Sequence, residues 1–255
     1  MTSRKAKTPW PSPDGFQKFA AELERVPLMH FLGIDPKLIP ESVMFSPDEF
    51  WHDMFGMGYA KRLPDFVIRL GNGNIRIIEM RSTADDMDLF EFCGHAVFFL
   101  TKEAEKFDCL EDIPPIWVTS VYAATIEFRP ASSYPLEEFK DKSSLRFRMG
   151  QIFLEDKIVM SEVVRKFRAA VEAWKKDRIG YPLSPVDFIE LFLAPFGLLP
   201  DSPRELIEKY LGLGRDLSEL TGDLTILGRM LNAVMIRGGI AAEDTLARFK
   251  EILRA

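Results

Sequence analysis

The sequence is poor in the residues that build disulfide frameworks and zinc sites. It contains two cysteines, Cys93 and Cys109, and three histidines in 255 residues. The cysteines form no CxxC pair, and no second pair of ligands accompanies Cys93 and His95. We therefore predict neither a disulfide framework nor a zinc site, and we expect Cys93 to be a buried structural thiol.

Long apolar runs are also absent. No stretch reaches the roughly 18 consecutive apolar residues that a membrane-spanning helix needs. The beginning of the chain, MTSRKAKTPWPSPDG, is basic and proline-rich and lacks the apolar segment of a secretory signal. The sequence therefore predicts a cytoplasmic protein without a membrane partner, and a flexible arm over residues 1–15.

Charge of one sign is not in large excess. Charged residues make up 28% of the chain, and the formal net charge is −6. A protein that mainly coats DNA or RNA is normally basic, so the composition disfavours that class while allowing local basic patches. Apolar residues make up 47%, including 21 Phe, which is enough for a sizeable core in one large domain or two small ones.

The apolar pattern changes character along the chain. In the first half the expected elements are a helix over 16–31, a short strand over 41–45, two strands over 64–82, a helix from about 86 to 107 and a strand over 116–128. From Ser161 onward the pattern indicates helices only, one of which begins with Ser184 as N-cap and Pro185 at its first position. We predict an α/β domain with a central mixed sheet over 16–150 and a helical region over 151–255.

The stretch PDFVIRLGNGNIRIIEMRS predicts a β-hairpin whose charged residues gather at one end. Asp65 opens the first strand, and Glu79 and Arg81 close the second. Because side chains alternate across a strand, Glu79 and Arg81 share one face. Two opposed carboxylates repel unless a cation lies between them, and carboxylates that converge on a divalent cation suit phosphodiester chemistry. Charged strand ends that only aid solubility are the alternative interpretation.

The loop length decides whether Asp65 reaches the same face. A two-residue type I′ turn at Asn72-Gly73, which local propensity favours, would pair Phe66 with Glu79 and send Asp65 to the other face. A three-residue loop that ends with Gly73 in the left-handed conformation places Asp65 across from Glu79. We predict the three-residue loop, because only this register brings the two carboxylates together.

These residues resemble the motif of the PD-(D/E)XK nuclease superfamily. The match is Pro64-Asp65 followed by Glu79-Met80-Arg81. The elements expected around it, over roughly residues 10–130, are most similar to the recombination-promoting nuclease, or transposase-like, branch found in bacteria. The resemblance implies a restriction-endonuclease-like core, Mg²⁺ or Mn²⁺ held by Asp65 and Glu79, and hydrolysis of DNA in a context of mobile-element recombination.

Arg81 departs from the superfamily, which most often has Lys at this position, and from the branch, which often has Gln. A buried Lys can lose a proton, whereas Arg effectively cannot. The alternative is therefore a binding or interaction module that keeps the nuclease fold without catalysis. The acidic net charge and the helical region, where a protein partner or a second copy could dock, fit this alternative.

The superfamily often adds an acid from its first helix, and the helix after the motif often supports the site. The candidates for these supporting roles are Glu22, Glu24, Glu41 and His95. His95 fits a core histidine with satisfied hydrogen bonds equally well. The sequence does not choose among these candidates.

Overall fold

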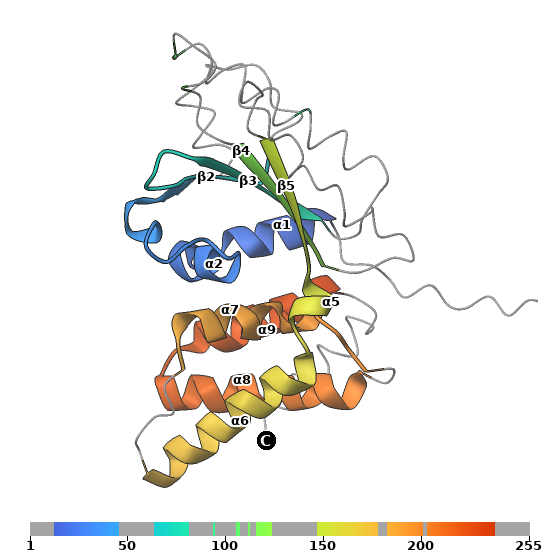
Figure 1. Ribbon diagram of the computed structural model, residues 1–255. Helices are drawn as coiled ribbons and strands as arrows, with labels where there is room; N and C mark the ends of the chain where they lie inside the picture. Colours follow the sequence, from blue (N-terminus) through green and yellow to red (C-terminus); the bar gives the residue numbers. More distant parts are fainter. Residues whose placement is uncertain are drawn as a thin grey trace, which may run out of the picture. The chain divides into compact units, whose positions relative to one another are not determined.

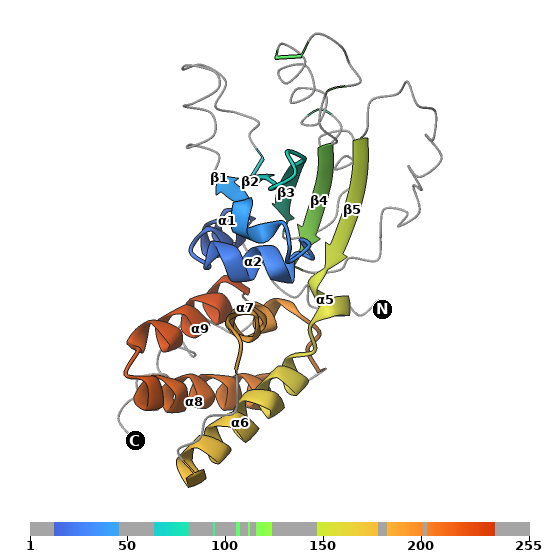
Figure 2. The ribbon, with the colours of Figure 1, turned by 60° about the vertical axis from the view of Figure 1, so that its left-hand side comes forward.

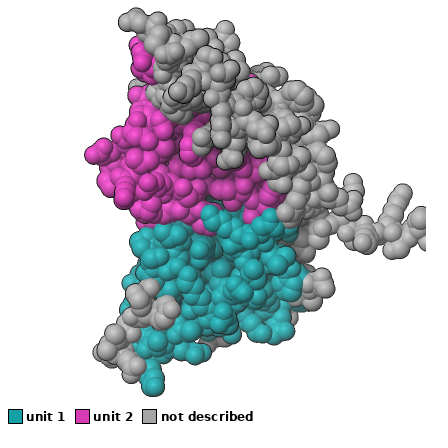
Figure 3. Space-filling view, viewed as in Figure 1, with its two compact units in different colours: residues 1–23, 154–255 teal, residues 24–153 magenta. Residues whose placement is uncertain are grey.

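The computed structural model describes residues 13–45, 64–81, 94, 106–107, 112, 116–123, 147–177, 183–200 and 203–237 (Figure 1). The chain divides into two compact units, one of residues 24–153 and the other of residues 1–23 and 154–255 (Figure 3). The described part of the fold is α/β with a five-stranded mixed sheet. None of the described helices is long and apolar enough to cross a membrane.

The unit of residues 24–153 contains the sheet, in the order β1-β2-β3-β4-β5 (Figure 2). Its strands are β1 (Val43–Phe45), β2 (Phe66–Arg69), β3 (Ile75–Arg81), β4 (Ile116–Tyr122) and β5 (Phe147–Phe153). The first three strands are antiparallel, whereas β3, β4 and β5 run parallel. The helices α2 (Arg25–Phe31) and η1 (Ile39–Glu41) precede β1, and the Arg25 guanidinium donates to the carbonyl of Met44 at 2.8 Å.

Strands β3 and β4 are buried on both faces. Neighbouring residues on opposite faces of β3, Ile77 and Ile78, are both fully buried, and Val118 and Val121 of β4 are buried in the same way. Burial on both faces explains why these strands are nearly continuous apolar runs rather than alternating ones. A charged residue in the middle of β3 is therefore an exception to the pattern.

The hairpin between β2 and β3 has the predicted three-residue loop. The N–H of Leu70 donates to the carbonyl of Asn74 at 2.8 Å, and the N–H of Gly73 donates to the carbonyl of Leu70 at 2.8 Å. Gly73 has φ of 83°, the left-handed conformation that the loop requires. The side chain of Asn72 accepts a further hydrogen bond from the N–H of Asn74. The prediction of loop length is confirmed.

The second unit is helical in its described part. Its elements are α1 (Pro13–Ala21), α5 (Leu154–Lys157), α6 (Met160–Asp177), α7 (Pro185–Leu193), η4 (Ala194–Phe196), α8 (Arg204–Thr221) and α9 (Leu224–Arg237). Phe16 and Phe19 of α1 lie against Phe196, with ring centroids 4.8 and 5.9 Å apart. The buried hydroxyl of Tyr210 donates to the carbonyl of Leu191 at 2.8 Å and joins α8 to α7.

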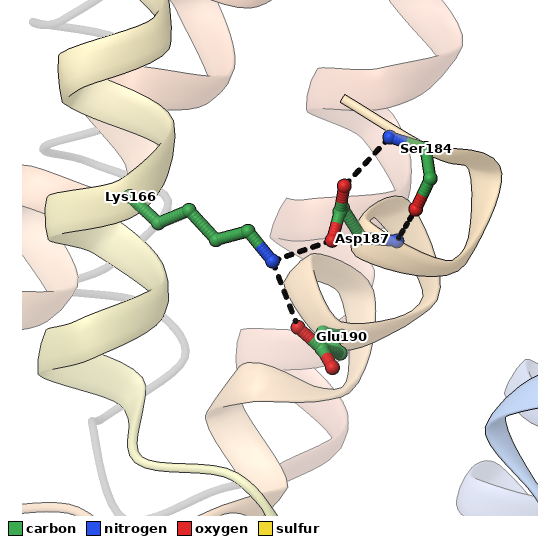
Figure 4. Close-up of polar contacts among 4 residues, drawn as sticks. All are labelled: Lys166, Ser184, Asp187 and Glu190. Atoms are coloured by element: carbon green, nitrogen blue, oxygen red, sulfur yellow. Dashed lines mark hydrogen bonds and ion pairs between the residues drawn. The ribbon is translucent and has the colours of Figure 1, made fainter. Parts of the chain in front are cut away.

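Helix α7 begins at Ser184, as predicted. The Ser184 side chain accepts from the N–H of Asp187, and the Asp187 carboxylate accepts from the N–H of Ser184, which completes a capping box. Lys166 of α6 donates to the same carboxylate at 2.5 Å and to Glu190 at 3.5 Å (Figure 4). The cap therefore also holds α6 and α7 together.

The structure corrects two predictions about secondary structure. The helix expected over 16–31 is divided into α1 and α2, because the ring of Pro27 would clash with the carbonyl of Leu23 in a continuous helix. Strand β5 was not predicted, since Arg148 and Gly150 interrupt its apolar pattern, and the expected boundary at residue 150 falls inside it. The predicted helix over 86–107 lies outside the described residues apart from positions 94, 106 and 107, and so do residues 238–255. Of the predicted flexible arm over 1–15, residues 1–12 lie outside the described residues and residues 13–15 belong to α1.

Candidate functional site

Asp65 lies opposite Glu79 in the hairpin. The register of β2 and β3 runs from Arg69 paired with Ile75 to Phe66 paired with Ile78, and one further step places Asp65 across from Glu79. Glu79 is only 2% exposed, and Asp65 is half-buried. The predicted register is therefore confirmed, while the roles of the two acids remain a prediction.

The carboxylate of Asp65 ends the hairpin ladder. Hydrogen-bonded pairs alternate along an antiparallel ladder, so a continued ladder would pair Met80 with Pro64, which could only accept because proline has no N–H. Instead, the N–H of Met80 donates to Asp65 Oδ2 at 2.5 Å. A carboxylate has about four acceptor positions, so one such hydrogen bond is compatible with metal ligation.

Arg81 completes the predicted set at the end of β3. It lies two residues beyond Glu79 and therefore on the same face of the sheet. The carbonyl of Arg81 accepts from the N–H of Ala123 at 2.8 Å, so the pairing of β3 with β4 continues to this point. Asp65, Glu79 and Arg81 thus share one face at one end of the hairpin, where the parallel strands also end.

Two residues that the sequence did not single out extend a polar row from Glu79 across the sheet. In the parallel part of the sheet Glu79 is paired with Ser120 of β4, and Ser120 is paired with Gln151 of β5. Paired residues of parallel strands point to the same face, so the three side chains form a polar row across β3, β4 and β5. Ser120 is fully buried, and within the described structure neither its Oγ nor Gln151 Oε1 has a hydrogen-bond partner.

On the other face of β4, the hydroxyl of Thr119 has a hydrogen-bond partner. Thr119 Oγ1 accepts a hydrogen bond from Arg76 Nε at 3.0 Å. The same guanidinium lies over the ring of Trp117, 5.7 Å from its centroid, and burial lowers the pKa of Arg76. The two neighbouring hydroxyls of β4 therefore differ. Thr119 Oγ1 has a hydrogen bond, whereas Ser120 Oγ, on the face of Glu79, has none within the described structure.

Among the proposed supporting residues, Glu41 lies away from these acids. A Cβ added to Gly71 would lie 2.8 Å from the Cβ of Glu41, which places Glu41 beside the turn of the hairpin. Asp65 lies at the other end of β2, six residues from Gly71 and therefore roughly 20 Å away at about 3.3 Å per residue, so Glu41 does not join the pair. Glu22 is exposed and belongs to the other unit, and His95 lies outside the described residues.

The donor atoms on this face fit a hard divalent cation. Two carboxylates, a hydroxyl and an amide oxygen are all oxygen donors, the type that Mg²⁺ prefers, and Mg²⁺ is commonly held by only one or two protein carboxylates with water in the other positions. Among the described residues no group of three or more His, Cys, Asp and Glu could hold a metal ion. A cation here would therefore depend on Asp65, Glu79 and water.

Comparison with known proteins gives no relative: no family model, curated protein or solved structure matches the chain. Membership of the PD-(D/E)XK superfamily therefore stays a prediction from the motif. The functional argument rests on the register, the burial and the chemistry of the residues described above.

Proposed function

We propose that the chain is a metal-dependent endonuclease that hydrolyses DNA phosphodiester bonds on a restriction-endonuclease-like core. The observation that carries this proposal is the placement of Asp65 opposite Glu79, with Arg81 on their face. A charged hairpin end that only aids solubility would be exposed, whereas Glu79 is 2% exposed within a sheet. Buried charges occur where they are paired or coordinate metals.

Asp65 and Glu79 are the residues that would hold Mg²⁺ or Mn²⁺. A divalent cation held there supplies polarisation of a phosphoryl oxygen and lowers the pKa of water. In the reaction a water oxygen forms a bond to phosphorus, and the bond from phosphorus to one sugar oxygen breaks. The water gives up a proton, and the departing sugar oxygen takes one up.

Arg81 has a restricted role in this chemistry. Its guanidinium stays protonated, so Arg81 cannot accept the proton of the attacking water. A fixed cation can instead hold a phosphate oxygen and offset the negative charge that develops there. Arg81 is therefore assigned to the phosphate and not to proton transfer.

The identity of Arg81 also favours a second candidate, a binding module that keeps the fold without cleavage. If the reaction needs a base at this position, the chain lacks one. Such a module would bind DNA or a protein partner, and the link to mobile-element recombination rests on the resemblance alone.

Incubation with supercoiled plasmid and Mg²⁺ or Mn²⁺ tests the nuclease. We expect the wild type to produce nicked circles, and we expect Asp65→Asn and Glu79→Gln, which keep the shape of each side chain, to lose about 100-fold or more of the rate. Nicking that persists in Asp65→Ala contradicts the assignment of the site.

Calorimetry with Mg²⁺ separates the two candidates. Absence of both metal binding and cleavage supports the module. Metal binding without cleavage would mean that Arg81 prevents catalysis. In that case Arg81→Lys should produce nicking, because a buried Lys can lose its proton.

A further inference from the structure

The polar row of Glu79, Ser120 and Gln151 contains two buried acceptors that the protein itself leaves unsatisfied. Ser120 Oγ and Gln151 Oε1 have no hydrogen-bond partner among the described residues. Burying a polar atom without a partner costs stability, so most such atoms in native proteins are satisfied by protein or by ordered water. Two of them at adjacent register positions therefore indicate a ligand that donates hydrogen bonds.

We propose that Ser120 and Gln151 hold ordered water molecules beside the Asp65–Glu79 pair and orient the water that surrounds a divalent cation. This inference rests on the metal site of the proposed function. Mg²⁺ gives up its water reluctantly and keeps several molecules when it binds to protein. Those waters donate hydrogen bonds outward, and a hydroxyl oxygen and an amide oxygen are suitable acceptors.

The sheet confines this polar row. On one side lies the buried Val118, two residues earlier on the same face of β4. On the other side the rings of Tyr122 and Phe153 are stacked, with centroids 5.0 Å apart. Apart from the Tyr122 hydroxyl these neighbours are apolar, so water beside Glu79 would take its hydrogen bonds mainly from the row itself.

Thr119 provides the internal comparison. It neighbours Ser120 in β4, but its hydroxyl points to the other face and already accepts from Arg76. Thr119 therefore has a structural hydrogen bond, whereas Ser120 has none. If Ser120 serves the metal site, its removal should affect metal binding and not folding; for Thr119 the opposite should hold.

The test measures Mn²⁺ affinity by calorimetry and unfolding by urea without metal. For Ser120→Ala and Gln151→Leu we expect the Mn²⁺ dissociation constant to rise about 10- to 100-fold, the usual effect of losing a group that supports metal ligands. We expect the metal-free urea midpoint to stay the same or rise, because neither Ser120 Oγ nor Gln151 Oε1 has a hydrogen bond within the described protein to lose. The control Thr119→Val should lower the midpoint and leave the Mn²⁺ affinity unchanged.

The outcomes separate this inference from the proposed function. Wild-type Mn²⁺ affinity in both Ser120→Ala and Gln151→Leu overturns the inference alone, and a lowered urea midpoint with unchanged affinity identifies a structural role instead. A wild type that binds no Mn²⁺ overturns both proposals. A wild type that binds Mn²⁺ without nicking DNA overturns the nuclease only, and a raised dissociation constant in the variants then still supports the inference.

Discussion

The carboxylate of Asp65 accepts a hydrogen bond of 2.5 Å from the backbone N–H of Met80. This bond satisfies the N–H of Met80, a residue of the buried strand β3, just before β2 begins. The same carboxylate is also the first metal ligand in the proposed function. Asp65 thus has a structural role that can be measured and a chemical role that can be separated from it.

Asp65→Asn and Asp65→Ala separate these two roles. Asn keeps an oxygen that can accept from Met80, whereas Ala leaves a buried N–H without its partner. We expect Asp65→Ala to lower the free energy of unfolding by about 1–3 kcal/mol, and Asp65→Asn by clearly less. Urea unfolding measures this difference.

Calorimetry with Mn²⁺ measures the chemical role of Asp65 in the same variants. Both should lose Mn²⁺ binding, because neither side chain carries a charge. Wild-type Mn²⁺ affinity in Asp65→Asn would remove Asp65 from the set of ligands.

The left-handed conformation of Gly73 gives a second prediction. A Cβ at Gly73 would meet no atom within 4 Å, so Gly73→Ala is opposed by its φ of 83° and not by crowding. We expect a loss of about 1–2 kcal/mol in the free energy of unfolding. Gly212 of α8 is the matched control, since a Cβ there also meets nothing within 4 Å. Gly212→Ala should stabilise the protein by up to about 1 kcal/mol, and thermal unfolding of the two variants should shift in opposite directions.

The cluster of Ser184, Asp187 and Lys166 at the start of α7 predicts that the stability of the protein falls at acidic pH. Burial alone would raise the pKa of Asp187, but hydrogen bonds from Lys166 and Ser184 outweigh it and leave the pKa below its usual value. A carboxyl group whose pKa is lowered by folding contributes stability above its unfolded pKa of about 3.9, and this stability is lost as the pH falls through the folded pKa. We therefore expect Asp187→Asn to destabilise the protein by about 1 kcal/mol near neutral pH and by less below pH 4.

Urea unfolding between pH 7 and pH 2.5 measures this effect. Glu205 is the control: its carboxylate pairs with Lys209 on the exposed surface of α8. Glu205→Gln should leave the urea midpoint unchanged throughout, because exposed pairs of this kind add little. An equal loss at both ends of the pH range in Asp187→Asn would contradict the role of its charge.

The hydroxyl of Tyr210 gives a prediction at alkaline pH. Burial raises the pKa of Tyr210 well above its usual value, and its hydroxyl donates to Leu191. A group whose pKa is raised by folding contributes stability below its unfolded pKa of about 10, and this stability is lost as the pH rises further. Tyr210→Phe should cost about 1 kcal/mol at pH 7, and the difference from wild type should shrink above pH 10. Urea unfolding at pH 7 and pH 10.5 measures both values.

Local chemistry made several features predictable from the sequence. The loop that ends at Gly73 needs a residue that tolerates positive φ, and the start of α7 needs an N-cap such as Ser184 followed by Pro185. The start of α7 can be recognised from these few residues alone. At Asn72-Gly73, by contrast, local propensity favours the two-residue turn, and the three-residue loop is predicted because only its register brings Asp65 and Glu79 together. The hairpin register follows from the loop length, and with it the placement of Asp65 across from Glu79.

Contacts between segments far apart in the sequence decided which residues of β4, β5 and β1 lie near the hairpin and at which end. The polar row beside Glu79 exists because β3, β4 and β5 run parallel in one register, and no local pattern specifies which residue of β4 meets Glu79. Strand β5 has a weak pattern of its own and forms against the edge that β4 offers. For the same reason the sequence could not choose whether Glu41 accompanies the two acids, because pairing between β1 and β2 sets which end of the hairpin Glu41 meets. The sequence by itself determined the two acids and their hairpin, and tertiary pairing decided that Ser120 and then Gln151 continue a polar row from Glu79.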